Sequence, residues 1–380
     1  MKILTNIKFV KLAGITQTFS AFIDFAEKDK QTKINIVGVT MANRKIGARE
    51  GFNAVKRNKF SLLSVKIKIP SIKRVMKKAK DIEDVKRAYK HIIEAYDKTI
   101  KQEKPDLILI NGTYYMPWCL LQASKANNIP VVLHYHGVLT KETADWKEVP
   151  RKIFRQMEEC FDDKKLFYLF PSNLTKEVVE KEVFGHRVSK FSILPNPVSL
   201  RFFEAHSKSR HRNIGIISRW QKVKNTGFWE KLADYNQKNG DKFKINIVTD
   251  LKKGNKHRDK LDGLVRFRRP MSNGRLAKFY EDMDVIVSPS HFETYGNVAN
   301  EAIATGTPAL ISKNMGVSEV FKNLGLDRWI IDFNSVKNVY EKINKAIKQK
   351  VDTETRNKMK ELYSSGAVYG KMFSILNSIQ

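Results

Sequence analysis

Short apolar runs rich in β-branched residues alternate with longer helical patterns along the chain, and this alternation constrains the fold more than any other feature. Polar, Gly or Pro residues bound each run. The runs are residues 2–7, 34–40, 107–110, 131–134, 166–169 and 191–194 in the first half, and 214–218, 244–248, 264–267, 285–288, 309–312 and 329–332 in the second. Because alternating strands and helices form βαβ units, the sequence predicts parallel sheets in an α/β fold.

A break in this pattern marks the predicted domain boundary. The segment PNPVSLRFFEAHSKSRHRN, which begins at Pro195, contains two prolines followed by a polar, basic run. We therefore predict two Rossmann-like, doubly wound domains, residues 1–196 and 197–352, which face each other across a cleft. Residues 353–380 are predicted to form a C-terminal helix that caps the structure or crosses back to the first domain. Ligands of such sheets bind where loops leave the carboxyl ends of the strands.

Composition narrows the class of protein. With 42% apolar and 29% charged residues, the chain has a soluble globular composition, and no apolar run is long enough to cross a bilayer. The first residues, MKILTNIKFVKLAG, alternate polar and apolar side chains and look like a strand, not a signal peptide, so the expected location is the cytoplasm. Cys119 and Cys160 are too few for a disulfide framework or a zinc finger.

The formal net charge is +30, and much of it lies between residues 44 and 80. The basic residues of this stretch, opposed only by Glu50, are Arg44, Lys45, Arg49, Lys56, Arg57, Lys59, Lys66, Lys68, Lys73, Arg74, Lys77, Lys78 and Lys80. They form either a solvated face or a surface for an anionic partner, such as the inner face of the cell membrane or an anionic polymer. Nucleic acid is the weaker alternative, because no zinc-finger, helix-turn-helix or RNP pattern accompanies the charge.

The stretch SHFETYGNVANEAIATGTP, which begins at Ser290, carries two carboxylates in a setting suited to ligand binding. Glu293 falls in the loop after a predicted strand, and Glu301 falls about one turn into the helix that follows. Gly296 allows the backbone to approach a ligand closely, and Asn297 is expected to cap a helix that begins at Val298. Backbone amides of residues 295–298 would gather at that helix start, where they favour an anion.

The same stretch resembles the nucleotide-sugar motif of glycosyltransferase family 4, a family of retaining enzymes with the GT-B fold. Its hallmark is two glutamates separated by seven residues, here in PSHFETYGNVANEAIATGTPALIS. NMGVSEV, from Asn314, resembles the glycine turn of the family. SRWQKVKN, ILPNPV and HYHG resemble its arginine and lysine pair, its interdomain Pro-Asn segment and its histidine near the reacting sugar. The resemblance is concentrated between residues 193 and 320.

The resemblance implies a role for each matching residue. Arg219 and Lys224 would hold the donor diphosphate, Glu301 would accept hydrogen bonds from the ribose, and Glu293 would bind the donor sugar without acting as a nucleophile. The expected catalytic residues are His136, Glu293, Arg219 and Lys224. The expected donor-binding residues are Gly14, Asn196, Thr294, Tyr295, Gly296, Asn297 and Glu301. No metal and no further cofactor are expected, because Arg219 and Lys224 would stabilise the leaving phosphate.

Three places differ from the pattern of the family. Its N-terminal Gly-Gly loop is reduced to Leu-Ala-Gly-Ile at residues 12–15, and Pro197 replaces a glycine. After residues 245–248 the chain has TDLKKGNKH instead of a Gly-x-Gly-Pro turn, so the wall around the base is not carried over. Asp282 and Asp284 form an Asp-x-Asp pair, but they lead into a predicted strand and are interpreted as a helix end, not as a metal site.

The sequence thus predicts a retaining glycosyltransferase that moves a hexose or N-acetylhexosamine from a nucleotide diphosphate sugar to an acceptor hydroxyl. A UDP-sugar is expected over a GDP-sugar, and the acceptor is expected to be a glycan, a lipid-linked or an anionic polymer of the cell envelope. Two alternatives remain open. A GT-B nucleotide-sugar epimerase would share the donor site, and a nonenzymatic binder of anionic polymers or nucleic acid would explain the charge but not the paired glutamates.

Overall fold

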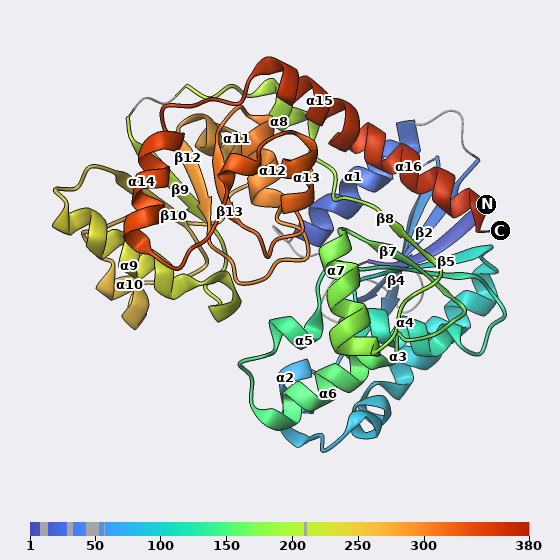
Figure 1. The fold of residues 1–380 in the computed structure, drawn as a ribbon. Coiled ribbons are helices and arrows are strands. Elements are labelled where there is room, and N and C mark those ends of the chain that lie inside the picture. Colours follow the sequence, from blue (N-terminus) through green and yellow to red (C-terminus); the bar gives the residue numbers. More distant parts are fainter. Residues whose placement is uncertain (8–13, 29–32, 43–52, 57, 209–210, 380) are drawn as a thin grey trace. The chain divides into compact units, whose positions relative to one another are not determined.

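The computed structural model of the chain describes residues 1–7, 14–28, 33–42, 53–56, 58–208 and 211–379 (Figure 1). The chain divides into two compact units. Unit 1 comprises Met1–Leu194 together with Tyr369–Gln380, and unit 2 comprises Pro195–Val368. Each unit is built around one sheet, as the alternation of strand and helix patterns predicts.

The sheet of unit 1 has eight strands in the order β3-β4-β2-β1-β5-β6-β7-β8. The strands are β1 (Lys2–Asn6), β2 (Asn35–Ala42), β3 (Asn53–Lys56), β4 (Phe60–Lys66), β5 (Leu107–Asn111), β6 (Val131–His134), β7 (Leu166–Phe170) and β8 (Phe191–Ile193). All pair in parallel except β3, which runs antiparallel to β4. The carboxyl ends of β1, β5 and β6 therefore lie side by side at one edge of the sheet.

Strands β3 and β4 were not predicted. They lie within the basic stretch, which was interpreted by its charge alone, and the expectation that every strand alternates with a helix is wrong there. The burial pattern of β4 explains the weak signal, because only Phe60 and Leu63 are fully buried and the other residues of that strand are half-buried. A half-buried strand near the edge of a sheet can form with few consecutive apolar residues.

Helices cover the sheet of unit 1 (Figure 1). They are α1 (Gly14–Lys28), α2 (Ile72–Lys78), α3 (Ile82–Glu103), α4 (Tyr115–Ser124), α5 (Leu139–Glu142), α6 (Glu148–Glu159) and α7 (Asn173–Val178), which continues as a π-helix (Val179–Phe184). The longest of them, α3, is capped by Asp81, whose side chain accepts a hydrogen bond from the Asp84 amide. Ser172 caps α7 by accepting from the Thr175 amide.

The sheet of unit 2 has six strands in the order β11-β10-β9-β12-β13-β14, and all of its pairs are parallel. The strands are β9 (Asn213–Ile217), β10 (Lys244–Val248), β11 (Arg266–Arg268), β12 (Val285–Ser288), β13 (Ala309–Ser312) and β14 (Ile330–Ile331). Three of them, β10, β12 and β13, match the predicted residues at both ends. The strand order reverses between β9 and β12, and the carboxyl ends of strands at such a switch point are where ligands bind.

Two layers of helices enclose this sheet. The helices are α8 (Leu200–Glu204), the 3₁₀ turn η2 (Lys222–Lys224), α9 (Thr226–Lys238), α10 (Lys256–Lys260), α11 (Asn273–Glu281), α12 (Asn297–Ala304), α13 (Ser318–Asn323), the 3₁₀ turn η3 (Asp327–Trp329), α14 (Val336–Ala346) and α15 (Thr353–Tyr363). Helices α9 and α14 pack together on one face, and α8, α11 and α12 pack together on the other (Figure 1). The core includes the buried rings of Trp229, Tyr280 and Trp329.

The C-terminal helix α16 (Ser365–Ser378) begins in unit 2, and its residues from Tyr369 onward belong to unit 1. There the rings of Tyr369 and Phe373 pack against Phe22 of α1, each with ring centroids 5.4 Å apart. Within the part of the chain that the structure describes, no helix combines the length and the apolar character needed to cross a membrane. Cys119 is buried and Cys160 is partly buried, and both are free thiols.

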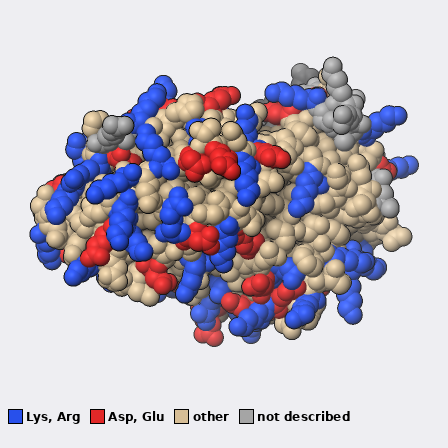
Figure 2. All heavy atoms as spheres, turned by 45° about the horizontal axis from the view of Figure 1, so that its top comes forward, with Lys and Arg blue, Asp and Glu red and all other residues tan. Residues whose placement is uncertain are grey.

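Basic side chains are spread over the surface. Figure 2 shows Lys and Arg across the whole visible face, with acidic side chains between them. In the basic stretch the exposed members are Lys68, Lys73, Arg74, Lys77, Lys78 and Lys80, most of them on or beside α2. Arg44, Lys45, Arg49, Glu50 and Arg57, with the side chain of Lys56, lie outside the described residues.

Candidate active site

Glu293 lies in the loop after β12, and the loop after β13 fixes its backbone. Its amide donates to the carbonyl of Asn314 (3.1 Å), and its own carbonyl accepts from the Gly316 amide (3.0 Å). Its side chain is held as well: Oε1 accepts from Ser290 Oγ at 2.6 Å and lies 3.2 Å from Lys224 Nζ. The carboxylate is therefore positioned before any ligand binds.

Lys224 reaches this carboxylate from η2, in the loop that follows β9. Both side chains are only about one fifth exposed, 23% for Lys224 and 20% for Glu293, so their attraction is less screened than that of a surface pair. Arg219 lies in the same loop and its side chain is exposed. The structure thus brings Lys224 and Glu293 into contact as an ion pair and places Arg219 nearby in sequence with a side chain free to reach solvent.

Gly296 precedes helix α12 and has a φ of +118°. A Cβ atom at this position would lie 2.8 Å from Met315 Cε and 2.9 Å from Val317 Cγ1. The residue is therefore glycine for two reasons, its backbone conformation and the close approach of the next loop. The predicted cap was wrong by one residue: Gly296 is the N-cap, and Asn297 is the first residue of the helix.

Replacing Gly296 with alanine is expected to lower the free energy of unfolding by about 2 kcal/mol or more, because both the left-handed backbone and the added methyl group are strained. Chemical denaturation of the purified variant measures this change. Gly227→Ala is the matched control in the same unit, since no atom lies within 4 Å of a Cβ placed there, and its effect should stay within about 0.5 kcal/mol. Equal stability of the two variants would contradict the assignment of strain to Gly296.

Asn297 contacts a second predicted residue. Its Oδ1 accepts from Asn196 Nδ2 at 2.9 Å, so the structure brings these two donor-binding candidates together. Thr294 is half-buried beside Glu293. The ring of Tyr295 is buried, and its hydroxyl accepts from Asn300 Nδ2 at 2.7 Å inside the core. Only its backbone amide is left for a ligand.

Glu301 lies on α12, half-buried, and Tyr280 of α11 holds it. The Tyr280 hydroxyl donates to Glu301 Oε2 at 2.7 Å. Burial raises the pKa of Glu301 to about 7, and the hydrogen bond from Tyr280 opposes this shift. Tyr280 itself was not singled out from the sequence, because a tyrosine at helical spacing on an apolar face has the pattern of an ordinary core residue.

Unit 1 carries a separate polar cluster at the carboxyl ends of β1, β5 and β6. The rings of His134 and His136 lie 4.1 Å apart, and His136 Nε2 lies 3.5 Å from Asn111 Oδ1. Asn111 in turn donates to Thr5 Oγ1 at 2.7 Å. Burial lowers the pKa of His136 to about 4, so its imidazole is neutral at neutral pH. His136 is therefore suited to hydrogen bonding with a hydroxyl and not to acting as a cation.

Glu158 supports the loop that follows His136 and was missed in the sequence. This carboxylate of α6 is fully buried, and it accepts hydrogen bonds from the Leu139 amide (2.9 Å), the Thr140 amide (2.8 Å) and Thr140 Oγ1 (2.8 Å). Burial raises its pKa to about 7 against the effect of these bonds. A signal was present, because Glu158 follows Phe154 by one helical turn on the apolar face of the helix.

Gly14 and Asp284 do not belong to the ion pair, and each lies at or next to the end of a helix or strand. Gly14 is the first residue of α1, and residues 12 and 13 of the reduced loop lie outside the described residues. Asp284 is buried and its carboxylate accepts from the amides of Asn213 (2.8 Å) and His211 (3.2 Å), which is a structural role. Among the described residues, no group of three or more His, Cys, Asp or Glu side chains is arranged to hold a metal ion.

The chain is similar to known glycosyltransferases. Residues 202–362 match the family model of glycosyl transferases group 1, and residues 80–202 match that of glycosyltransferase family 4. The chain is 24% identical over 255 residues to the putative glycosyltransferase EpsF of Bacillus subtilis, a match of 60% of this chain and 62% of that protein. It is 30% identical over 105 residues to the capsular polysaccharide biosynthesis glycosyltransferase CapM of Staphylococcus aureus, over 26% and 27% of the two chains.

The matches therefore span less than two thirds of the length of these relatives. Among solved structures, the sucrose-phosphate synthase of Thermosynechococcus elongatus is similar over 100% of this chain and 98% of its own, with a TM-score of 0.74 and 12% identity, which speaks for the fold alone. The two family models together cover residues 80–362, well over half of the chain. The chain belongs to glycosyltransferase family 4 and has the GT-B fold.

Proposed function

We propose that this glycosyltransferase moves a hexose or N-acetylhexosamine from a nucleoside diphosphate sugar to an acceptor hydroxyl, with retention of the anomeric configuration. The observation that carries the proposal is the contact of Lys224 with Glu293 beside the start of α12. A cation and a carboxylate in one place suit a donor that presents both a diphosphate and sugar hydroxyls. Glu301 lies on α12 and is proposed to accept hydrogen bonds from the ribose.

The proposed chemistry assigns one task to each group. As the bond between the sugar and the diphosphate breaks, negative charge grows on the leaving oxygen, and Lys224 with Arg219 stabilises it. Glu293 accepts hydrogen bonds from the donor sugar and fixes its orientation, because Ser290 and the backbone hold the carboxylate still. The acceptor oxygen attacks from the side of the leaving phosphate, which receives the proton. In this proposal no covalent glutamate intermediate forms, and these cations take the place of a metal.

The donor is proposed to be a UDP-sugar in preference to a GDP-sugar. The acceptor is proposed to be a glycan, a lipid-linked or an anionic polymer of the cell envelope, in keeping with the name of the relative CapM. A nucleotide-sugar epimerase of the same fold is the rival enzyme, and incubation with donor alone separates the two. An epimerase would change the sugar of the donor without any acceptor.

Binding of the UDP-sugar is expected to weaken by about tenfold when the pH falls from 8 to 6. Glu301 has a pKa of about 7 in the free protein, and ribose hydroxyls donate to its ionised form. With that pKa the ionised fraction drops from about ten elevenths at pH 8 to about one eleventh at pH 6. Isothermal titration with a UDP-sugar measures the effect, because its diphosphate diester does not titrate in this range. Glu301→Gln should flatten the profile, and an equally steep profile in that variant would assign the dependence to another group.

A peripheral place on an anionic membrane surface is also part of the proposal. It rests on the exposed basic residues on and around α2, such as Lys73, Lys77 and Lys78, each of which adds up to about 1 kcal/mol near such a surface. Sedimentation with vesicles of phosphatidylglycerol tests it against vesicles of phosphatidylcholine. Binding that is equal for both lipids, or that is unchanged in Lys73→Glu/Lys77→Glu, would overturn this part.

A further inference from the structure

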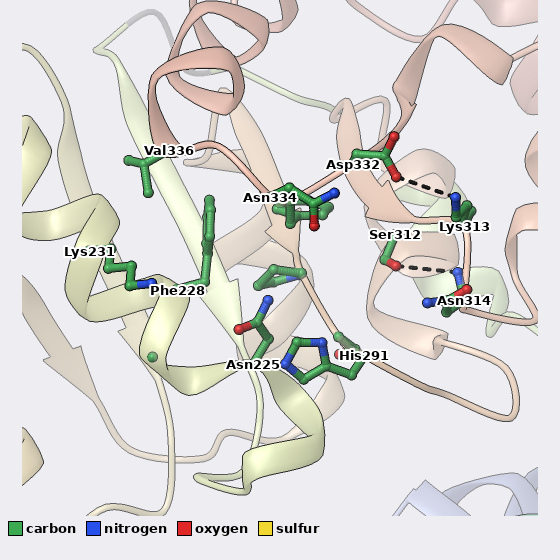
Figure 3. Close-up of a pocket in the computed structure, with 14 residues that line it drawn as sticks. Asn225, Phe228, Lys231, His291, Ser312, Lys313, Asn314, Asp332, Asn334 and Val336 are labelled. Atoms are coloured by element: carbon green, nitrogen blue, oxygen red, sulfur yellow. Dashed lines mark hydrogen bonds and ion pairs between the residues drawn. The ribbon is translucent and has the colours of Figure 1, made fainter.

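A cavity of about 440 Å³ lies in unit 2 at the carboxyl ends of β12, β13 and β14 (Figure 3). Helices α9 and α14 form its other wall. Its lining includes Asn225, Phe228, Lys231, His291, Asn314 and Asn334. The cavity is distinct from the donor site proposed above, because its lining does not include Glu293, Lys224 or Glu301. Its volume is in the range of cavities that hold small ligands.

The polar lining has the chemistry that sugar hydroxyls require. Asn225, Asn314 and Asn334 each present an amide, which offers both a donor and an acceptor and so pairs with neighbouring hydroxyl groups. His291 adds another group of the same kind. Figure 3 shows Asn225, His291 and Asn334 gathered around one space, with Phe228 beside them. The three asparagines and His291 come from four different loops, which would let them surround a sugar ring.

The apolar lining complements the polar groups. The rings of Phe228 and Phe333 stand perpendicular to each other with centroids 5.2 Å apart, and Val336 extends the same wall. Apolar surface of this kind covers the C–H face of a pyranose ring. The charged groups nearly balance: Lys231 and Lys313 stand against Asp332, which lies 3.6 Å from Lys313 in an exposed pair. The lining thus suits a neutral or singly anionic hexose and not a nucleoside diphosphate.

The walls of the cavity are the loops that hold the ion pair of the donor site. Ser290 lines the cavity and donates to Glu293 at 2.6 Å. The amide of His291 donates to the carbonyl of Val223, next to Lys224, at 2.9 Å, and the carbonyl of Asn314 accepts from the Glu293 amide. A ligand in the cavity would therefore touch, from the other side, the loops that fix Glu293 and Lys224.

We infer that this cavity is a carbohydrate subsite that binds one hexose unit of the glycan that the enzyme extends. The inference rests on the proposed function, since it takes the acceptor to be a glycan.

Saturation-transfer NMR on the full chain tests the subsite with two probes, the methyl glycosides of N-acetylglucosamine and of glucuronic acid. The two probes separate a neutral from an anionic preference. We expect at least one to bind with a dissociation constant of about 1–10 mM, as is usual for a small ligand with few contacts. Asn334→Trp fills the cavity from an exposed position and should weaken binding by at least about tenfold. Lys231→Trp, on the exposed side of α9, is a second filling variant.

Gln237→Trp is the matched control, because Gln237 is exposed on α9 and does not line the cavity. It should bind the probe as the wild type does. The UDP-sugar affinity of Asn334→Trp should stay within about threefold of the wild type, which separates failure of the subsite from failure of the donor site. Probe binding that is unchanged in both filling variants, or no binding of either probe to the wild type, would overturn the subsite. If the wild type did not bind the UDP-sugar, the proposed function itself would be overturned.

Discussion

Lys224→Ala is expected to lower the rate of sugar transfer by about 10²–10³-fold. The ammonium group lies 3.2 Å from Glu293 Oε1 and is proposed to face the leaving phosphate. Removing one preorganised group that stabilises charge in a transition state costs about 3–4 kcal/mol in enzymes. The loss should appear mainly in kcat, because charge on the leaving oxygen grows only as the bond breaks. Release of nucleoside diphosphate from the UDP-sugar measures the rate.

Lys222→Ala is the matched control, since Lys222 lies on the same 3₁₀ turn and is exposed. It carries the same charge, so it corrects for a change in the overall electrostatic field. We expect its rate to stay within about threefold of the wild type. If both variants lost activity equally, or if Lys224→Ala kept its kcat, Lys224 would not be the group that stabilises the leaving phosphate.

Glu158→Ala is expected to lower the free energy of unfolding by about 3 kcal/mol. The change leaves the amides of Leu139 and Thr140 and the Thr140 hydroxyl without their acceptor, and the site is fully buried. Each buried donor left without a partner costs about 1–3 kcal/mol, and relief of the desolvated charge returns part of this. Chemical denaturation gives the total. Hydrogen exchange should show faster exchange of the Leu139 and Thr140 amides than in the wild type.

The neighbouring carboxylate provides the control for this change. Glu159 pairs with Arg155 across one turn of α6 at 2.9 Å, and that pair is exposed to solvent. Glu159→Ala should therefore change stability by no more than about 0.5 kcal/mol. Equal effects of the two substitutions would show that the three hydrogen bonds to Leu139 and Thr140 do not account for the loss.

The strands of unit 2 could be predicted closely because they are short, buried on both faces and bounded by polar or Gly residues. Strands β12 and β13 are examples, since each begins with three consecutive apolar residues. The loop after β12 could be interpreted for a related reason: Gly296 and Gly306, with φ of +118° and +87°, mark the two ends of α12 in the sequence.

The rest depended on contacts between residues far apart in the chain. Tyr280 holds Glu301 across 21 residues, and Glu158 holds Thr140 across 18. No local pattern in the sequence links the members of either pair. Strands β3 and β4 escaped prediction because their pairing, not their apolar content, makes them strands.

The anomeric configuration of the transfer product tests the proposed retaining transfer most directly. The protein is incubated with the UDP-sugar that it binds and with a set of glycan acceptors, and the new linkage is followed by NMR. We expect release of the nucleoside diphosphate and a product with the same anomeric configuration as the donor. A product of inverted configuration, or a donor converted to an epimer without transfer to any acceptor, would contradict it.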